Sequence, residues 1–259
     1  MNTLNVERAD GIAVVTLNRP PVNAVSLEMQ RELQTTFESF AEDRTVGAVV
    51  LAGAGDRAFC GGIDLKEIAD DNEALTSIRT LTNPGWEWRL TQKLIRHCAV
   101  PVIAAVERPA IGAGFGLIGV CDLVIASQTA TFALTEINVG LLGGASKALR
   151  LLGPQKARMM MYTGRPQSAE EMHRLGAVER VVEPGEALSA ARGIARDIAT
   201  KSPLAIRLAK ESIVRIEGDQ MEQQYRTEWD YTNRLRGLND SREAMSAFIE
   251  KRAPVWSWS

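Results

Sequence analysis

One glutamate stands in surroundings that favour proton transfer. Between Pro109 and Ser146 only Asp122 and Glu136 carry charge, although charged residues make up 24% of the chain. Such a run is expected in the interior of the fold, where an ionised carboxylate without partners is costly and its pKa rises. Glu136, flanked by apolar residues and glycines, is therefore a candidate for taking and returning a proton near neutral pH. A structural role is the alternative that the residue pattern leaves open.

The other carboxylate of this run, Asp122, precedes the expected strand Leu123–Ala126. A carboxylate at the start of a buried strand can be held by backbone N–H groups, which keep it ionised. We interpret Asp122 as a structural residue.

Two glycine-rich segments have the composition of a site for negative charge. They are Gly112-Ala113-Gly114-Phe115-Gly116-Leu117-Ile118-Gly119 and Ala58-Phe59-Cys60-Gly61-Gly62-Ile63-Asp64-Leu65-Lys66-Glu67. Glycine has no Cβ, so backbone N–H groups approach a ligand closely, and a helix that starts at such a segment adds the positive end of its dipole. This arrangement suits an oxygen on which negative charge develops. Glycines that only allow tight helix packing are the alternative.

The stretch Gly114 to Gly119 also fits the dinucleotide fingerprint G-x-G-x-x-G. That fingerprint places its turn directly after a strand, whereas Glu107–Ala113 separate these glycines from the expected strand that ends at Val106. A nucleotide-dependent oxidoreductase is therefore disfavoured.

A catalytic cysteine and a zinc site are also disfavoured. The two histidines, His97 and His173, stand in expected helices with no Cys/His signature around them. We interpret Cys60 as a small buried thiol.

Strand and helix patterns alternate along most of the chain, which predicts an α/β protein with βα-type crossovers. Apolar or β-branched runs predict strands at Ile12–Leu17, Val46–Leu51, Pro101–Val106, Leu123–Ala126, Thr131–Leu134 and Val178–Val182. Helical periodicity predicts helices at Leu27–Asp43, with Ser26 as N-cap, and at Trp86–His97.

After about residue 186 only helices are expected, at Ala187–Thr200, Pro203–Glu217, Gln220–Leu238 and Arg242–Lys251. The turn Glu183-Pro184-Gly185 therefore divides an expected core, residues 1–185, from a helical C-terminal region, residues 186–259. These helices have the pattern of elements that cap the core or meet another subunit.

Composition excludes several classes of protein. The formal net charge of −2 leaves no basic excess for a phosphate backbone, so no nucleic-acid partner is expected. The uncharged stretches are too short for a membrane-spanning helix, which needs about 18–20 residues, and the charged N-terminus is unlike a signal peptide. Three cysteines at spacings unlike those of a metal site read as reduced thiols, so we expect a cytoplasmic protein without a metal.

Taken together, these segments resemble the enoyl-CoA hydratase/isomerase, or crotonase, superfamily over nearly the whole chain. The likeness rests on ordered motifs: Asn18-Arg19-Pro20 with Asn23-Ala24, Ala58–Glu67, Gly112–Asp122, Phe132–Gly140, Pro203-Leu204-Ala205 with Lys210, and Ala247 to Arg252. The resemblance implies a spiral of ββα units with a C-terminal α-helical region that builds trimers or dimers of trimers. It also implies an acyl-CoA thioester as ligand and no cofactor, because coenzyme A is part of the substrate.

By position, the resemblance assigns roles to particular residues. The backbone N–H groups of Ile63 and Ala113 would form an oxyanion hole, and Glu136 would be the catalytic acid and base. Substrate contacts would come from Ala24, Ala58, Cys60, Gly61, Gly62, Asp64, Leu65, Lys66, Gly112, Phe115, Gly116 and Gly140. Basic residues that could meet the phosphates of coenzyme A are Arg19, Arg57, Lys66, Lys251 and Arg252.

One departure from the family pattern affects the expected reaction. Hydratases with two glutamates carry the second one at the position of Gly116, which cannot activate water or donate a proton. Reversible hydration of an α,β-unsaturated acyl-CoA with Glu136 as acid and base is our leading hypothesis. A Δ3,Δ2-enoyl-CoA isomerase and a hydroxycinnamoyl-CoA hydratase-lyase, the latter with help from Tyr225 or Tyr231, are the enzymatic alternatives. A non-catalytic acyl-CoA binding protein is the alternative of another class.

Overall fold

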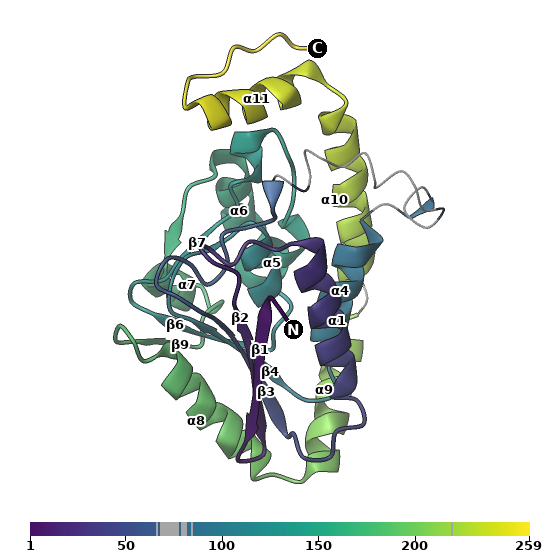
Figure 1. Cartoon of the computed structure of the whole chain (residues 1–259), viewed down its shortest axis with the longest axis vertical. Coiled ribbons are helices and arrows are strands. Elements are labelled where there is room, and N and C mark those ends of the chain that lie inside the picture. Colours follow the sequence, from purple (N-terminus) through teal and green to yellow (C-terminus); the bar gives the residue numbers. More distant parts are fainter. Residues whose placement is uncertain (66, 68–77, 79–81, 84, 219) are drawn as a thin grey trace.

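Six strands of the described chain form the main sheet (Figure 1). The computed structural model describes residues 1–65, 67, 78, 82–83, 85–218 and 220–259. The sheet has the order β1-β2-β3-β4-β6-β9, with β1 at Leu4–Ala9, β2 at Ile12–Leu17, β3 at Ala48–Gly53, β4 at Val102–Val106, β6 at Leu123–Ser127 and β9 at Arg180–Val182. β1 pairs antiparallel with β2 and the other neighbours pair parallel. Every residue of β4 is buried, as expected for a central parallel strand covered on both faces.

A second, smaller sheet of the described residues brings three distant segments together. Its order is β5-β7-β8, with β5 at Ala110–Ile111, β7 at Thr131–Ala133 and β8 at Gln167–Ser168. β5 and β7 run parallel, so the residues that follow them, Gly112 and Glu136, leave the same edge of the sheet. An isolated bridge between Cys60 and Ala110 adds the segment around Cys60 to this edge.

Helices cover both faces of the main sheet (Figure 1). α8 (Ala187–Ala199) packs on one face, where Ala191 and Ala195 join a core cluster with Val50 and Ile103. The larger cluster on the other face includes Phe37 of α1 (Leu27–Ser39) and Trp88 of α4 (Trp86–Arg96). The remaining helices are α5 (Ala113–Ile118), the 3-10 turn η1 (Glu136–Val139), α6 (Ala145–Thr163), α7 (Ala169–Arg174), α9 (Pro203–Glu217), α10 (Gln220–Arg236) and α11 (Asn239–Glu250).

Most elements expected from the sequence are present, with ends that differ by a few residues. Ser26 caps α1 as predicted, since its Oγ accepts from Met29 N at 3.1 Å. Two expectations need correction: the last helix begins at Asn239 and not at Arg242, and the long helix α6 was not anticipated. α8 lies on the core sheet, so residue 185 marks a change in secondary structure, while the division into two domains stays a prediction.

Asp122 has the structural role inferred for it. Its Oδ2 accepts from Val102 N at 2.7 Å, and both carboxylate oxygens accept from Lys210 Nζ of α9 at 2.5 and 2.6 Å. The Lys210 side chain is 4% exposed, and a buried ammonium is tolerated where a carboxylate pairs with it. This pair attaches α9 to the start of β6.

No helix among the described residues has both the length and the apolar character needed to cross a membrane.

Candidate active site

Three loops that are distant in sequence meet at the edge of the small sheet. Ile111 N donates to Cys60 O at 2.9 Å, and Gly112 N donates to Ala133 O at 2.9 Å. Gly114 brings the first turn of α5 against the Cys60 segment, because a Cβ there would overlap the carbonyl oxygen of Cys60 and lie 2.9 Å from its Cβ. The two predicted glycine-rich segments and Glu136 are therefore neighbours in space.

The carboxyl group of Glu136 lies against two glycines. A Cβ at Gly112 or at Gly143 would lie 3.2 Å from Glu136 Oε1, so both positions leave room for the carboxylate. Gly112 also has φ = +53°, in the left-handed region that favours glycine. Glu136 Oε2 is buried and has no hydrogen-bond partner among the described residues. Burial, aided by the negative charge of Glu228, raises the pKa of Glu136 from 4.5 to about 7.

Two backbone N–H groups near this carboxylate have no hydrogen-bond partner in the described part of the chain. The first belongs to Ile63: its neighbours bond to Val25, through Val25 N to Gly62 O at 2.8 Å and Asp64 N to Val25 O at 2.9 Å, and leave the Ile63 N–H unused. The second belongs to Ala113, the first residue of α5, where no carbonyl one turn earlier can accept it. Both were predicted as oxyanion-hole donors, and the residues that precede them are close in space, since a Cβ at Gly112 would lie 3.7 Å from Gly62 Cα.

Asn23 holds the loop that carries the first of these amides. Its side chain is buried, and its Nδ2 donates to the carbonyl oxygens of Ala54, Ala58 and Phe59 at 2.8, 3.0 and 3.3 Å. Its Oδ1 accepts from Arg19 N at 2.9 Å. The motif Asn18-Arg19-Pro20 with Asn23-Ala24 thus acts as a support for the segment that begins at Ala58.

We expect Asn23→Ala to destabilise the fold by about 2 kcal/mol, because it leaves buried carbonyl groups without a donor. Urea unfolding followed by circular dichroism measures the change. Asn5→Ala is the matched control, since Asn5 is exposed and surface substitutions alter stability by less than about 0.5 kcal/mol. Equal effects of the two substitutions would show that Asn23 has no such supporting role.

The other predicted site residues have different positions in the structure. Six of them lie close to Ile63 in the chain or next to Val25, which bridges Ile63: Ala24, Ala58, Gly61, Gly62, Asp64 and Leu65. Asp64 pairs with Arg19 at 2.5 Å. Cys60 and Phe115 have no exposed surface and belong to the core, and burial raises the pKa of the Cys60 thiol to about 12. Gly140 packs against α11, where Ser241 Oγ donates to its carbonyl oxygen at 2.6 Å. Lys66 lies outside the described residues.

Gly116 stands at the position where the family pattern has a second carboxylate, and a neighbouring side chain fills the space beside it. A Cβ at Gly116 would lie 3.3 Å from Cζ2 of Trp88, and Trp88 is 9% exposed. The tryptophan ring therefore takes up space that a larger side chain at position 116 would need. Trp88 has a packing role in the core.

Two functional candidates escaped the sequence interpretation, Glu228 on α10 and Lys147 on α6. Glu228 Oε1 accepts from Ser146 N at 2.5 Å and so caps α6, while its Oε2 is buried without a partner among the described residues. Lys147 is buried on α6, and its Nζ lies 4.0 Å from the ring centre of Tyr225. The sequence held one signal for Lys147, which is the first charged residue after the charge-poor run from Pro109 to Ser146. The glycines near it did not predict a helix, so its position on α6 was not foreseen.

The raised pKa of Glu136 predicts a pH-dependent stability. A carboxyl group whose folded pKa lies above its unfolded value contributes stability below pH 4.5 that is lost as the pH rises through about 7. Glu136→Gln stays neutral at every pH, so its stability relative to wild type should rise by about 2 kcal/mol between pH 5 and pH 8. Urea unfolding at the two pH values measures this. A difference that does not change with pH would contradict the raised pKa.

Comparison with known proteins agrees with this arrangement. The sequence profile of the family described as enoyl-CoA hydratase/isomerase matches residues 7–258. A Rhizobium meliloti protein named "Probable enoyl-CoA hydratase" is 37% identical over 254 residues, which cover 96% of each chain. The short-chain-enoyl-CoA hydratase of Clostridium acetobutylicum is 33% identical and covers 97% of this chain and 96% of its own. An enoyl-CoA hydratase/isomerase from Pseudoalteromonas atlantica superimposes with a TM-score of 0.87 at 28% identity and covers 98% of this chain and 100% of its own.

The two sheets, the helices around them and these structural likenesses define a protein of the crotonase fold. The match extends over almost the whole sequence. The chain belongs to the enoyl-CoA hydratase/isomerase family.

Proposed function

We propose that this protein hydrates an α,β-unsaturated acyl-CoA thioester reversibly. The observation that carries the proposal is Glu136: a buried carboxyl oxygen without a partner, a pKa raised to about 7, and two glycines that leave space beside it. The names of the relatives support the choice of reaction, since those at 33% and 37% identity are called enoyl-CoA hydratases.

In this proposal Glu136 carries out both proton transfers. Its carboxylate takes a proton from water as the water oxygen bonds to the β-carbon, and the electron pair of the double bond moves to give an enolate at the thioester. The N–H groups of Ile63 and Ala113 hold the enolate oxygen. This role is supported by their lack of a hydrogen-bond partner among the described residues. The α-carbon then takes the proton back from Glu136. The reaction needs no cofactor, because coenzyme A arrives with the substrate.

Double-bond isomerisation is the second candidate function. The space taken by Trp88 beside Gly116 favours it, because a single carboxylate suffices to carry a proton from the α-carbon of a 3-enoyl thioester to its γ-carbon. For a hydratase-lyase, Tyr225 is buried and Tyr231 is 54% exposed, so Tyr225 is the better placed of the two tyrosines.

Mass spectrometry separates these functions. Incubation of the protein with crotonyl-CoA in heavy-oxygen water should give a product that has gained one water and the label. Rearrangement of 3-hexenoyl-CoA without a gain of water would support the isomerase in its place. If neither substrate reacts and no deuterium from heavy water enters the α-carbon of a bound saturated acyl-CoA, the protein only binds acyl-CoA.

We also propose that the C-terminal helices make subunit contacts in a trimer or a dimer of trimers. Apolar side chains are exposed on α9 at Leu204, Leu208 and Ile216 and on α11 at Phe248 and Ile249, and exposed apolar surface of this kind marks association sites. Three buried free thiols suit a reducing compartment, which supports the cytoplasmic location.

Among the basic residues proposed for coenzyme A, four can be compared in the structure. Arg19 pairs with Asp64 and Arg252 pairs with Glu243 and Glu250. Lys251 is exposed at the end of α11, and Arg57 is exposed beside the Ala58 segment. Because of its position next to this segment, Arg57 is the best placed of the four to meet a phosphate.

A further inference from the structure

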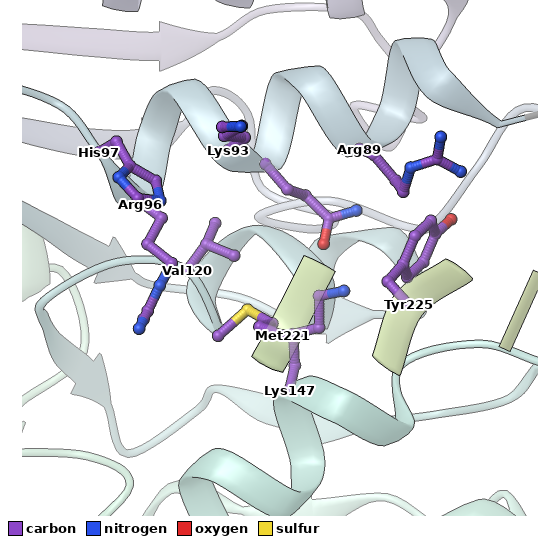
Figure 2. Close-up of a pocket in the computed structure, with 9 residues that line it drawn as sticks. Arg89, Lys93, Arg96, His97, Val120, Lys147, Met221 and Tyr225 are labelled. Atoms are coloured by element: carbon purple, nitrogen blue, oxygen red, sulfur yellow. The ribbon is translucent and has the colours of Figure 1, made fainter. Parts of the chain in front are cut away.

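A small cavity lies between α4, α6 and α10 (Figure 2). Its volume is about 30 Å³, which gives room for one or two water-sized groups. The charged side chains that line it, among the described residues, are all basic: Arg89, Lys93, Arg96 and Lys147. His97, the C-cap of α4, also lines it. Arg96 is already paired with Glu217 at 2.8 Å.

Lys147 contributes a buried amine to this cavity. The residue is 2% exposed, and its stem is fixed across Gly119, where a Cβ would lie 2.5 Å from the lysine Cβ. Nζ donates to Ser146 Oγ at 3.1 Å and lies over the Tyr225 ring, but it forms no ion pair with any described residue. Figure 2 shows the side chain rising from α6 toward Tyr225 and the underside of α4. A buried ammonium without an ion-pair partner is costly. Burial lowers the pKa of Lys147 to about 8, although the negative charge of Glu228 opposes this shift.

Gln92 adds a second unsatisfied group to the same cavity. It is 5% exposed, and neither its Oε1 nor its Nε2 has a partner among the described residues. Buried amides nearly always have partners in folded proteins, so an orphaned one needs an explanation. A ligand oxygen that accepts from both Gln92 Nε2 and Lys147 Nζ would give these two donors an acceptor.

The cavity lies at the far end of the helix that starts at the candidate active site. α5 has six residues from Ala113 to Ile118 and is therefore about 9 Å long. Gly112, directly before the helix, lies against Glu136, and Val120, just beyond the helix, lines the cavity. Tyr225 also lines the cavity. Burial raises its pKa, and the negative charges of Glu228 and Glu136 add to this rise. An acyl chain that runs beside α5 from Ala113 toward Val120 would bring its far end to Lys147.

We propose that this cavity binds a carboxylate at the far end of the acyl group, so that the substrates are mono-CoA thioesters of dicarboxylic acids. Lys147 forms an ion pair with the carboxylate, and Gln92 donates a hydrogen bond to it. This inference rests on the proposed function for the position of the thioester, but it concerns binding and does not depend on which reaction follows.

Binding of saturated thioesters tests the proposal without any turnover. Isothermal titration calorimetry compares adipyl-CoA with hexanoyl-CoA and suberyl-CoA with octanoyl-CoA, pairs that differ in the terminal group. We expect at least one dicarboxyl thioester to bind about 10–100-fold more tightly than its partner. Equal or weaker binding of both dicarboxyl thioesters would overturn the proposal, whether or not the protein hydrates crotonyl-CoA.

Two substitutions link the preference to the cavity. Lys147→Met keeps the stem and removes the charge, and Gln92→Leu removes the amide; each should reduce the preference for the dicarboxyl thioester about 10-fold or more and leave binding of the monocarboxyl thioester unchanged. Lys201→Met, at an exposed lysine, is the control for loss of one positive charge. Thermal unfolding verifies folding, and Lys147→Met should be as stable as wild type because it removes an unpaired buried charge.

Free adipate distinguishes the two possible sources of a carboxylate. If adipate alone bound in a Lys147-dependent manner while adipyl-CoA showed no preference over hexanoyl-CoA, the cavity would be a separate anion site, and the proposed substrate class would be wrong. A preference that survives both substitutions would also overturn it.

Discussion

Glu136→Gln is expected to lower kcat by about 10²–10⁴-fold, the usual contribution of a positioned acid and base. Glutamine has nearly the shape of the protonated glutamate, so it fits beside Gly112 and Gly143, where the carboxyl group lies against the backbone. It can neither take a proton from water nor return one to carbon. Hydration of crotonyl-CoA followed by absorbance at steady state measures the loss.

The binding of acyl-CoA is expected to persist in this variant, because in the proposed mechanism backbone N–H groups hold the thioester oxygen and the carboxyl group does not. Calorimetric titration with butyryl-CoA checks this separately from turnover. Glu170→Gln is the matched control, as Glu170 is an exposed glutamate of α7, and it should leave kcat unchanged. Full activity of Glu136→Gln would remove the basis of the proposed mechanism.

The pH dependence of kcat/KM in the wild-type protein tests the same residue. With a pKa of about 7 in the free protein, Glu136 is mostly ionised above pH 7 and mostly protonated below it. If the carboxylate must accept the proton of water, kcat/KM falls about tenfold for each pH unit below 7. An apparent pKa near 4.5 would indicate that substrate-free Glu136 is solvated as an ordinary glutamate.

Elements with a strong local pattern could be predicted from the sequence. Val102–Val106 is a run of apolar residues and is a buried strand, and Pro203–Glu217 begins with proline at its first turn and is a helix with those bounds. In both cases composition, periodicity and flanking residues agree. The crotonase fold as a whole was anticipated only through the ordered motifs, because no single segment specifies how strands from distant parts of the chain pair.

Helix α6 shows why other elements could not be predicted. It starts after two glycines, and Gly153 with φ = +70° interrupts it directly before Pro154. Glycine and proline inside a helix contradict local propensity, so only packing makes this segment helical. Because α6 was missed, so was Lys147, and with it the basic cavity that α4 and α10 complete.

The site itself was anticipated in its residue types more than in its geometry. Glu136 stood out because charge is depleted around it, and the glycines stood out because they cluster. Their proximity depends on the pairing of β5 with β7 and on the bridge from Cys60 to Ala110, which are contacts between residues far apart in the chain. Gly114, whose lack of a Cβ permits the closest of these approaches, could be recognised only in the folded structure.

Gly114→Ala is accordingly expected to lower kcat by about 100-fold, since misplacing reacting groups by about 1 Å has an effect of this size. A Cβ at position 114 would overlap the carbonyl oxygen of Cys60, so α5 must move away from the Cys60 segment. That movement separates the Ala113 N–H from the Ile63 N–H, although neither residue is changed. Steady-state hydration kinetics measure the effect, and overpacking should also reduce the free energy of unfolding by about 1–3 kcal/mol.

Gly193→Ala is the matched control, because it makes the same chemical change in a helix where nothing lies within 4 Å of the new Cβ. At this exposed position of α8 alanine should stabilise the protein by about 0.5–1 kcal/mol and leave kcat unchanged. The two substitutions should thus change the free energy of unfolding in opposite directions, because the space available to the added methyl group differs between the two positions. If Gly114→Ala kept wild-type kcat and stability, the close approach of the two glycine-rich segments would not be required, and the pair of N–H donors would lose its structural basis.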